Sequence, residues 1–464
     1  MREVIASETA PAGGVRIVGV LGGEPTDNVG IDIGDIPGFT GDLAMTRLLT
    51  IDGESVVLVG LGNELDFRGL RAAAGAAARA VPSPIPIATG LHTLDLDGSV
   101  AAVVSGLMLG SYRFDRYKSS GLEEFADAVL VGETPEEALE AASALARAVG
   151  RARDWVNTPP VDKAPEVLAE DMSAGLTEAG FVVEVWDEGR VIAERLGGVK
   201  AVAAGSDRPP RVVIGRRKAP EATAHLALVG KGIVFDSGGL SIKTAEGMER
   251  MKGDMAGAAA VVAAAEVIAA AGHPVDLTVI VLLTDNMTGG SASKPGDVLT
   301  ARNGKTIEIL NTDAEGRLIL ADGLALAAEE NPDVIVDVAT LTGACRVALG
   351  DSIAGLWASD DSTAASVLAA SEAAGERLWA MPLPGDYRSL IESPVADMKN
   401  TGGRMGGAIT AALLLAEFAG SGKWAHIDIA GPSWFFDDGP LGRKGGSGFG
   451  VGTLVALASM LSRS

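Results

Sequence analysis

The sequence is poor in cysteine, histidine and aromatic residues, and each shortage narrows the chemistry open to the protein. Cys345 is the sole cysteine among 464 residues, so no intrachain disulfide can form and a reducing compartment is expected. No H-x-x-x-H pair occurs, which argues against a histidine-based zinc site. The four histidines are dispersed: His92, His225, His273 and His426. No G-x-S-x-G elbow lies at a strand-to-helix turn, so a serine nucleophile is not indicated.

Positive charge is also scarce. Lysine and arginine number 38 against 61 acidic residues, which gives a formal net charge of −23 at pH 7, and the basic residues form no tract. Duplex DNA and anionic membranes bind basic patches, so neither a nucleic-acid partner nor a membrane partner is expected.

Long, strongly apolar runs are missing as well. The longest candidate, residues 255–272, is mostly alanine and carries Glu266. It therefore predicts a buried helix rather than a membrane span, which needs about 20 strongly apolar residues. The first 14 residues show no apolar core after their charges, so no secretory signal is expected there. We expect a cytoplasmic globular protein.

The N-terminal third of the chain alternates short apolar runs with helical patterns, which is typical of an α/β layer. Strands are predicted at residues 15–21, 55–61 and 100–107, and a helix at residues 67–81. A further helix begins after Thr134 and ends before the proline pair at 159–160. We interpret it as the link between an N-terminal domain, residues 1–155, and a second domain, residues 156–464.

The second domain alternates more strongly. Strands are predicted at residues 181–185, 211–214, 226–229, 277–283, 306–310, 334–338 and 426–429, and helices at 166–179, 255–271, 318–329 and 409–418. Several of these strands are apolar on both faces, as in a sheet covered on both sides. We therefore predict a two-domain α/β fold. Its N-terminal α/β domain is the smaller, and its C-terminal domain has a central mixed sheet with helices on both faces.

Two polar motifs fall where the predicted strands end, the place at which such sheets bind ligands. The first, V-G-K-G-I-V-F-D-S-G-G at residues 229–239, contains Lys231 and Asp236 and continues through Lys243 to Asp254. The second is N-T-D-A-E-G-R-L at residues 311–318. Four carboxylates cannot share one pocket in ionised form without cations between them, so a pair of divalent metal ions bridged by carboxylates would explain the pattern.

The pattern resembles the leucyl aminopeptidase (cytosol aminopeptidase) family. The octapeptide at residues 311–318 is the signature of that family, and the order Lys231, Asp236, Lys243, Asp254 matches it too. Further matches are Asn157 to Pro160, Met251, Thr340 to Ala344 and Trp424 to Gly431. Together they cover the chain from about residue 155 to its end. The sequence departs from the family at Thr244 and at Trp434, which puts substrate preference and loop shape in doubt.

The resemblance implies a metal-dependent aminopeptidase with two divalent ions in each subunit, Mn²⁺ or Zn²⁺. The implied ligands are Lys231, Asp236, Asp254, Asp313 and Glu315. The family reaction is attack by a metal-bridging hydroxide. Lys243 would stabilise the oxyanion, and a bicarbonate ion held by Arg317 would act as the base.

The resemblance further implies a preference for N-terminal leucine or other apolar residues of short peptides. The residues expected to bind substrate are Met251, Asn311, Thr340, Leu341 and Gly343. A homohexamer is implied, with a variable N-terminal domain that serves assembly or regulation. His426 and Asp428 alternate with apolar residues and are expected to support the sheet or the site from behind. A dipeptidase of the cysteinylglycine type, a DNA-associating regulator and a scaffold without activity remain as alternatives.

Overall fold

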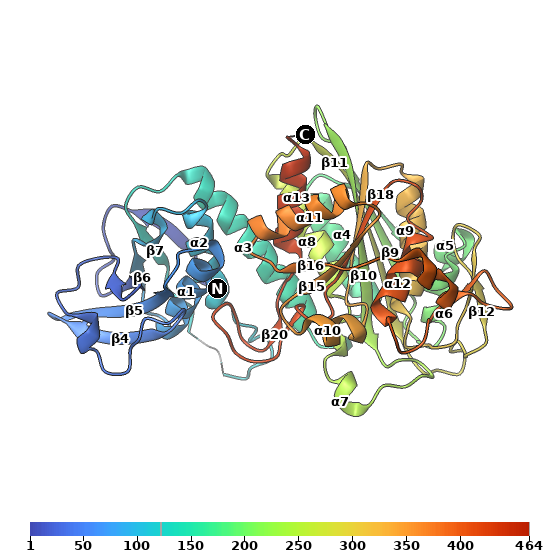
Figure 1. Ribbon diagram of the computed structural model, residues 1–464, viewed down its shortest axis with the longest axis horizontal. Helices are drawn as coiled ribbons and strands as arrows, with labels where there is room; N and C mark the ends of the chain where they lie inside the picture. Colours follow the sequence, from blue (N-terminus) through green and yellow to red (C-terminus); the bar gives the residue numbers. More distant parts are fainter. Residues whose placement is uncertain (121–122, 464) are drawn as a thin grey trace. The chain divides into compact units, whose positions relative to one another are not determined.

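The computed structural model describes residues 1–120 and 123–463, and within them the chain forms two compact units (Figure 1). The first unit comprises the described residues of Met1–Gly150 together with Phe435–Gly445. The second comprises Arg151–Trp434 and the described residues from Gly446 onward. The chain passes from the first unit to the second within helix α3 (Glu136–Asn157), at the place where the sequence predicts a linking helix.

The first unit is built on a seven-stranded sheet with the order β1-β7-β6-β2-β5-β4, in which β3 pairs with β2. Its strands are β1 (Val4–Ser7), β2 (Val15–Leu21), β3 (Glu24–Pro25), β4 (Thr46–Ile51), β5 (Glu54–Gly62), β6 (Ile87–Thr89) and β7 (Ala128–Val131). Helices α1 (Phe67–Ala80) and α2 (Ser99–Gly110) pack against each other, and α1 also covers β5.

The strand predicted at residues 100–107 is wrong, because these residues belong to helix α2. Ten of its twelve residues are buried, so the helix has no polar face. Periodicity cannot distinguish a fully buried helix from a buried strand in a short apolar run. The predicted strands at 15–21 and 55–61 and the helix at 67–81 are confirmed.

The second unit contains an eight-stranded mixed sheet with the order β16-β15-β18-β14-β10-β11-β9-β8. Its strands are β8 (Val182–Trp186), β9 (Arg211–Arg217), β10 (Ala224–Asp236), β11 (Val275–Asn286), β14 (Val334–Ala339), β15 (Ala354–Ala358), β16 (Leu378–Ala380) and β18 (Lys423–Asp428). The central strands β11, β10, β14 and β18 are mutually parallel, so their carboxyl ends meet at one edge.

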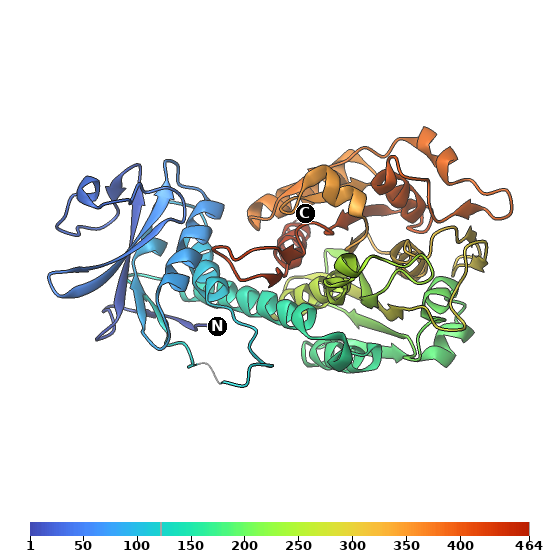
Figure 2. The ribbon, with the colours of Figure 1, turned by 90° about the horizontal axis from the view of Figure 1, so that it is seen from below.

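Helices cover both faces of this sheet (Figures 1 and 2). The helices of this unit are α4 (Pro165–Glu178), α5 (Glu188–Ala193), α6 (Gly197–Ala203), α7 (Ala245–Met248), α8 (Ala256–Ala270), α9 (Gly316–Glu329), α10 (Gly343–Leu349), α11 (Asp361–Ala373), α12 (Gly407–Ala416) and α13 (Val451–Leu461). On β10, Gly230 faces α8 and the adjacent Val229 faces α9, which places these two helices on opposite faces. The predicted two-domain α/β fold is confirmed.

The alanine-rich stretch forms the buried helix that its composition predicts. By length and composition alone, the helical stretch Ala245–Ala270 could cross a membrane, but 89% of its apolar window is buried inside the fold. The second unit also contains a small sheet of β12 (Val298–Thr300), β13 (Thr306–Glu308) and β17 (Met398–Lys399). A two-stranded sheet of β19 (Trp434–Phe435) and β20 (Gly445–Gly446) lies where the chain leaves the second unit and returns to it.

Candidate active site

Strand β10 supplies two of the predicted metal ligands. Lys231 lies inside the strand and Asp236 is its last residue, and both side chains are buried. Helix α9 approaches this strand closely, since a Cβ atom on Gly316 would lie 2.7 Å from Cε of Lys231. Glycine at this position therefore leaves the space that the lysine side chain fills.

The loop before α9 supplies Asp313 and Glu315. Glu315 directly precedes the helix, and the backbone amide of Asp313 donates to Oδ1 of Asn311 at 2.9 Å. Asn400 holds this loop from outside: its Nδ2 donates to the carbonyl of Asn311 at 2.6 Å, and its Oδ1 accepts from the amide of Leu310 at 2.9 Å. The loop is thereby fixed with both carboxylates directed toward the end of β10.

Asp254 enters the site from the face covered by α8. It follows the 3-10 turn Met251–Gly253 and lies two residues before the helix, and its Oδ1 accepts the hydroxyl of Thr340 at 2.7 Å. The helix can come this close because Gly257 has no side chain. A Cβ atom there would lie 2.0 Å from the carbonyl oxygen of Val338.

Lys231 connects two of the carboxylates. Its Nζ lies 2.8 Å from Oδ2 of Asp254 and 2.8 Å from Oε1 of Glu315, and it donates to the carbonyl of Thr340 at 2.8 Å. Burial lowers the pKa of Lys231, but the charges of Asp254 and Glu315 raise it by more, so the net pKa lies above the ordinary lysine value. Burial also raises the pKa of Asp254 to about 6.

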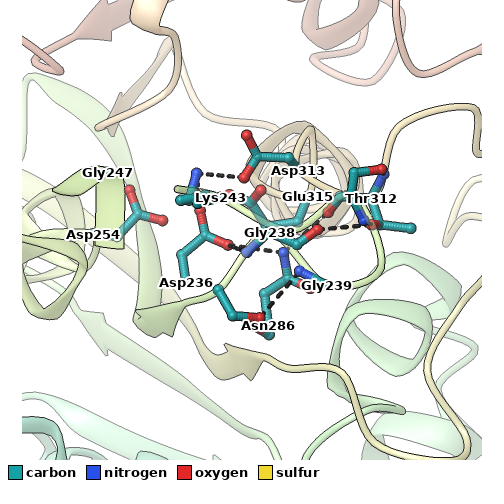
Figure 3. Close-up of polar contacts among 12 residues, drawn as sticks. Asp236, Gly238, Gly239, Lys243, Gly247, Asp254, Asn286, Thr312, Asp313 and Glu315 are labelled. Carbon is teal, nitrogen blue, oxygen red and sulfur yellow. Dashed lines mark hydrogen bonds and ion pairs between the residues drawn. The ribbon is translucent and has the colours of Figure 1, made fainter. Parts of the chain in front are cut away.

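Lys243 connects the other two carboxylates (Figure 3). Its Nζ lies 2.7 Å from Oδ2 of Asp236 and also pairs with Asp313. Asn286, the last residue of β11, donates its Nδ2 to Oδ1 of Asp236 at 2.8 Å. Burial, and then the neighbouring carboxylates, raise the pKa of Asp236 to about 8. The cluster is therefore short of positive charge.

The donor set fits divalent metal ions. Oxygen atoms of Asp236, Asp313 and Glu315 lie within 4.8 Å of one another. Oε2 of Glu315 is buried and has no hydrogen-bond partner among the residues that the structure describes. A buried carboxylate oxygen without a partner is costly unless a cation binds it. Hard oxygen atoms of this kind suit ions such as Mn²⁺ or Mg²⁺.

The acidic cluster lies in a cleft of about 800 Å³, which also contains most of the residues expected to bind substrate. Its lining includes all the predicted metal ligands and Lys243, and four of the predicted substrate-binding residues: Met251, Thr340, Leu341 and Gly343. Trp434, one of the departures from the family pattern, lines the cleft too. This tryptophan therefore stands where it can affect substrate preference.

Two predicted site residues, Arg317 and Asn311, are not part of the cleft lining. Arg317 is buried in α9, and its Nη1 donates to the carbonyl of Asn400 at 2.8 Å. Burial lowers its pKa to about 10, so the guanidinium is charged at neutral pH. Asn311 is engaged in the hydrogen bonds that shape its own loop.

Asp428, the last residue of β18, supports the cleft from behind. Its Oδ2 accepts the hydroxyl of Thr342 at 2.7 Å, and its Oδ1 accepts the amide of Leu341 at 3.1 Å. Its neighbour His426 is fully buried, with Nδ1 2.6 Å from Oδ1 of Asp337. The carboxylate of Asp428 thus holds the loop that follows β14 in position, a supporting role that the sequence pattern predicts.

Asn286 and Asn400 are functional residues that the sequence analysis missed. The side chain of each donates a hydrogen bond to a motif residue, but neither asparagine belongs to a sequence motif that would indicate this role. Lys163 was missed for the same reason. Its buried Nζ donates to the carbonyls of Trp155 at 2.7 Å and Lys252 at 2.7 Å, which ties the end of α3 to the turn before Asp254.

Comparison with known proteins identifies the family. The profile of the cytosol aminopeptidase family, catalytic domain, matches residues 150–455, and the profile of the N-terminal domain of the same family matches residues 29–121. The chain belongs to the cytosol aminopeptidase family. It is therefore a leucyl-aminopeptidase-type hydrolase, and the activity of the family is metal-dependent hydrolysis at peptide N-termini.

Relatives within the family match most of the chain. A probable cytosol aminopeptidase of Streptomyces coelicolor is 46% identical over 436 residues, which cover 87% of this chain and 84% of that protein. One from Chlorobaculum tepidum is 42% identical over 458 residues, covering 91% of this chain and 90% of that protein.

Two solved structures are similar throughout. The bottromycin maturation enzyme BotP in complex with Mn has a TM-score of 0.90 and 37% identity, covering 97% of this chain and 100% of that chain. The cytosol aminopeptidase of Coxiella burnetii has a TM-score of 0.86 and 30% identity, covering 98% of this chain and 99% of that chain.

Proposed function

We propose that this protein releases N-terminal leucine or other apolar residues from short peptides, with two divalent ions in the cleft. One observation carries the proposal: four carboxylates from three separate segments of the chain meet two lysines in a single cluster, most of which is buried. The Mn in the BotP structure supports manganese as one of the ions. Zn²⁺ suits the same donors.

In this proposal five side chains hold the ions: Lys231, Asp236, Asp254, Asp313 and Glu315. When bound, the ions supply polarisation of the scissile carbonyl and a hydroxide nucleophile at neutral pH. Lys231 is an ammonium while the carboxylates alone surround it, because they hold its pKa above the ordinary value. Bound ions would lower the pKa of Lys231, so that the side chain would lose its proton and could act as a neutral amine ligand.

The remaining polar residues position charge around the scissile bond. Lys243 reaches into the cleft beside Asp236 and Asp313, from where its ammonium can stabilise a developing oxyanion. We infer that Arg317 binds bicarbonate as the external base. Its Nε is buried and has no hydrogen-bond partner within the described residues, which supports an anion there. Because Arg317 does not line the cleft, the bicarbonate ion would have to lie between the guanidinium group and the residues that line the cleft.

The side chain of the first substrate residue would lie against Met251, Thr340, Leu341 and Gly343, a largely apolar wall that favours leucine. Asn311 acts by holding the loop that carries Asp313. Membership of the family supports the homohexamer that the resemblance implies and the cytoplasmic location that we expect from the sequence. Sedimentation velocity would test the oligomer.

The test is hydrolysis of Leu-Gly and leucine p-nitroanilide by metal-stripped protein that is resupplied with Mn²⁺, Zn²⁺ or Mg²⁺. We expect the metal to restore leucine release, and Glu315→Gln and Lys243→Ala to lower kcat/KM by about 100-fold or more. Glu188→Gln, an exposed carboxylate on α5, is the matched control. Absence of turnover with every ion, in folded protein that binds two equivalents, would overturn the proposal.

A further inference from the structure

The cleft has a charged rim as well as an acidic floor. We define the rim as the lining residues Ile242, Arg250, Arg346, Val347 and Asp351. Among the floor residues, Asp236, Asp254 and Glu315 are buried, whereas Val347 and Ile242 on the rim are 88% and 60% exposed. The rim therefore forms the open side of the cleft. The proposed mechanism uses none of the rim residues.

The rim carries more positive than negative charge. Nε of Arg346, on α10, lies 2.6 Å from Oδ1 of Asp351. Arg250, next to Met251 in the chain, also lines the cleft. Burial and then the charge of Arg346 lower the pKa of Arg250, while Asp351 raises it. Arg250 and Arg346 are thus close enough to act on each other electrostatically, and a substrate carboxylate beside them would be attracted by both guanidinium groups.

A substrate bound as the proposed function requires would bring such an anion. The free N-terminus of the peptide is directed to the floor, where the four carboxylates and the ions lie. The residue beyond the scissile bond then lies toward the open side, because the floor is closed. There the planar fork of an arginine can bind a carboxylate through two parallel hydrogen bonds.

We propose that Arg250 and Arg346 form a subsite for a carboxylate on the leaving residue of the substrate. This inference rests on the proposed aminopeptidase function and specifies its substrate class. The carboxylate is either the free C-terminus of a dipeptide or the side chain of an acidic second residue. The exposed apolar side chains of Ile242 and Val347 line the same cleft.

A substrate series tests the subsite in the metal-loaded wild-type protein. We compare Leu-Gly, which has a free carboxylate, with the neutral Leu-glycinamide and with Leu-Asp-amide, which carries its carboxylate on the side chain. A charge-assisted hydrogen bond in a half-buried site predicts at least about 10-fold higher kcat/KM for Leu-Gly than for Leu-glycinamide. Leu-Asp-amide tells whether a side-chain carboxylate also binds.

Variants assign the preference to the two arginines. Arg250→Gln and Arg346→Gln are each expected to raise KM for Leu-Gly by about 10-fold with little change in kcat, and to change Leu-glycinamide by less than about 2-fold. Arg346→Lys keeps the positive charge but loses the planar guanidinium, so its KM for Leu-Gly should lie between those of the wild type and Arg346→Gln. The matched control is Arg190→Gln. Arg190 forms an ion pair of 2.8 Å with Glu194 and is not part of the cleft lining.

The outcomes separate this inference from the function on which it rests. Equal kcat/KM for Leu-Gly and Leu-glycinamide in the wild type would overturn the subsite and leave the aminopeptidase intact. Equal losses on both substrates in the variants would overturn it as well, since a structural defect affects every substrate. Failure of the wild type to cleave any leucyl substrate would overturn the proposed function instead.

Discussion

The side-chain nitrogen of Lys163 lies 2.7 Å from the backbone carbonyl oxygen of Lys252. The same nitrogen donates to the carbonyls of Trp155 at 2.7 Å and Val156 at 3.2 Å. In return, Nζ of Lys252 donates to the carbonyl of Asn157 at 2.6 Å. Burial, and then the charge of Lys252, hold the pKa of Lys163 well below its ordinary value. Through these hydrogen bonds Lys163 and Lys252 connect the end of α3 to the turn Met251–Gly253, which precedes Asp254.

Replacing Lys163 by methionine should destabilise the protein. The variant keeps most of the side-chain volume but leaves three buried carbonyls without this donor, so we expect the free energy of unfolding to fall by about 1–3 kcal/mol. Urea denaturation followed by tryptophan fluorescence measures the change. Lys200→Met, at an exposed position of α6, should stay within about 0.5 kcal/mol of wild type. If the two variants were equally stable, the free-energy cost of burying the Lys163 amino group would equal the stabilisation from its hydrogen bonds.

Gly316→Ala should disturb the floor of the cleft without removing a polar group. The new methyl group would lie 2.7 Å from Cε and 2.9 Å from Nζ of Lys231, so Lys231 must move and lose an ion pair. We expect Mn²⁺ affinity, measured by calorimetric titration, and kcat/KM for Leu-Gly each to fall by about 10-fold or more. Gly385→Ala, where a Cβ atom meets nothing within 4 Å, is the control. Unchanged Mn²⁺ affinity in Gly316→Ala would contradict the close approach of α9.

Asp428→Asn tests the support behind the cleft. An amide nitrogen cannot accept the bonds that Leu341 and Thr342 donate, so the loop after β14 should lose its fixed position. We expect kcat/KM for Leu-Gly to fall by about 10-fold or more, together with a lower melting temperature. The exposed Asp361→Asn variant, in the first turn of α11, controls for the loss of one negative charge. Wild-type kinetics in Asp428→Asn would show that the loop keeps its shape without this carboxylate.

Glu266 should make stability depend on pH. Both of its carboxylate oxygens accept from Nη1 of Arg151 at 2.9 Å, but burial outweighs this pairing and raises the pKa of Glu266 from 4.5 to about 7. The folded state then binds this proton more tightly than the unfolded chain does. The contribution of Glu266 to the free energy of unfolding therefore falls as pH rises from about 4.5 to about 7, by roughly 3 kcal/mol in all.

The Glu266→Gln variant removes that titration, and the comparison isolates it from every other group. Relative to wild type, the variant should gain about 2–3 kcal/mol between about pH 5 and about pH 8 in urea denaturation. A difference between the two proteins that stays constant across this range would show that Glu266 keeps an ordinary pKa in the folded state.

Local sequence patterns predicted the elements that have one clear period or one clear motif. The buried strands β2 and β5 and the helix α8 follow from their apolar runs, and the two polar motifs follow from residues that stand close together in the chain. Helix α2 was misread because a helix buried on every side leaves no polar face to set the period.

The supporting residues could not be found in the same way. Asn286 lies 50 residues from the carboxylate it contacts, and Asn400 lies 89 residues from Asn311. Single polar residues at such separations carry no local signal, because the sheet order alone brings the strand ends together. The motif residues were found because the members of each motif stand close together in the sequence, whereas Asn286 and Asn400 come from distant segments.

Strand β10 lies between β11 and β14. Its pairing with β11 includes Lys231, and its pairing with β14 ends at Gly230, the preceding residue. Backbone amides in such a strand exchange their protons with solvent only when the whole unit unfolds, whereas loops open far more often. Lys231 and Asp236, which lie on this strand, are therefore expected to be the most rigid part of the site. Motion that turnover requires is expected in the loops that follow the strands, such as residues 237–255 and 340–342, rather than in β10 itself.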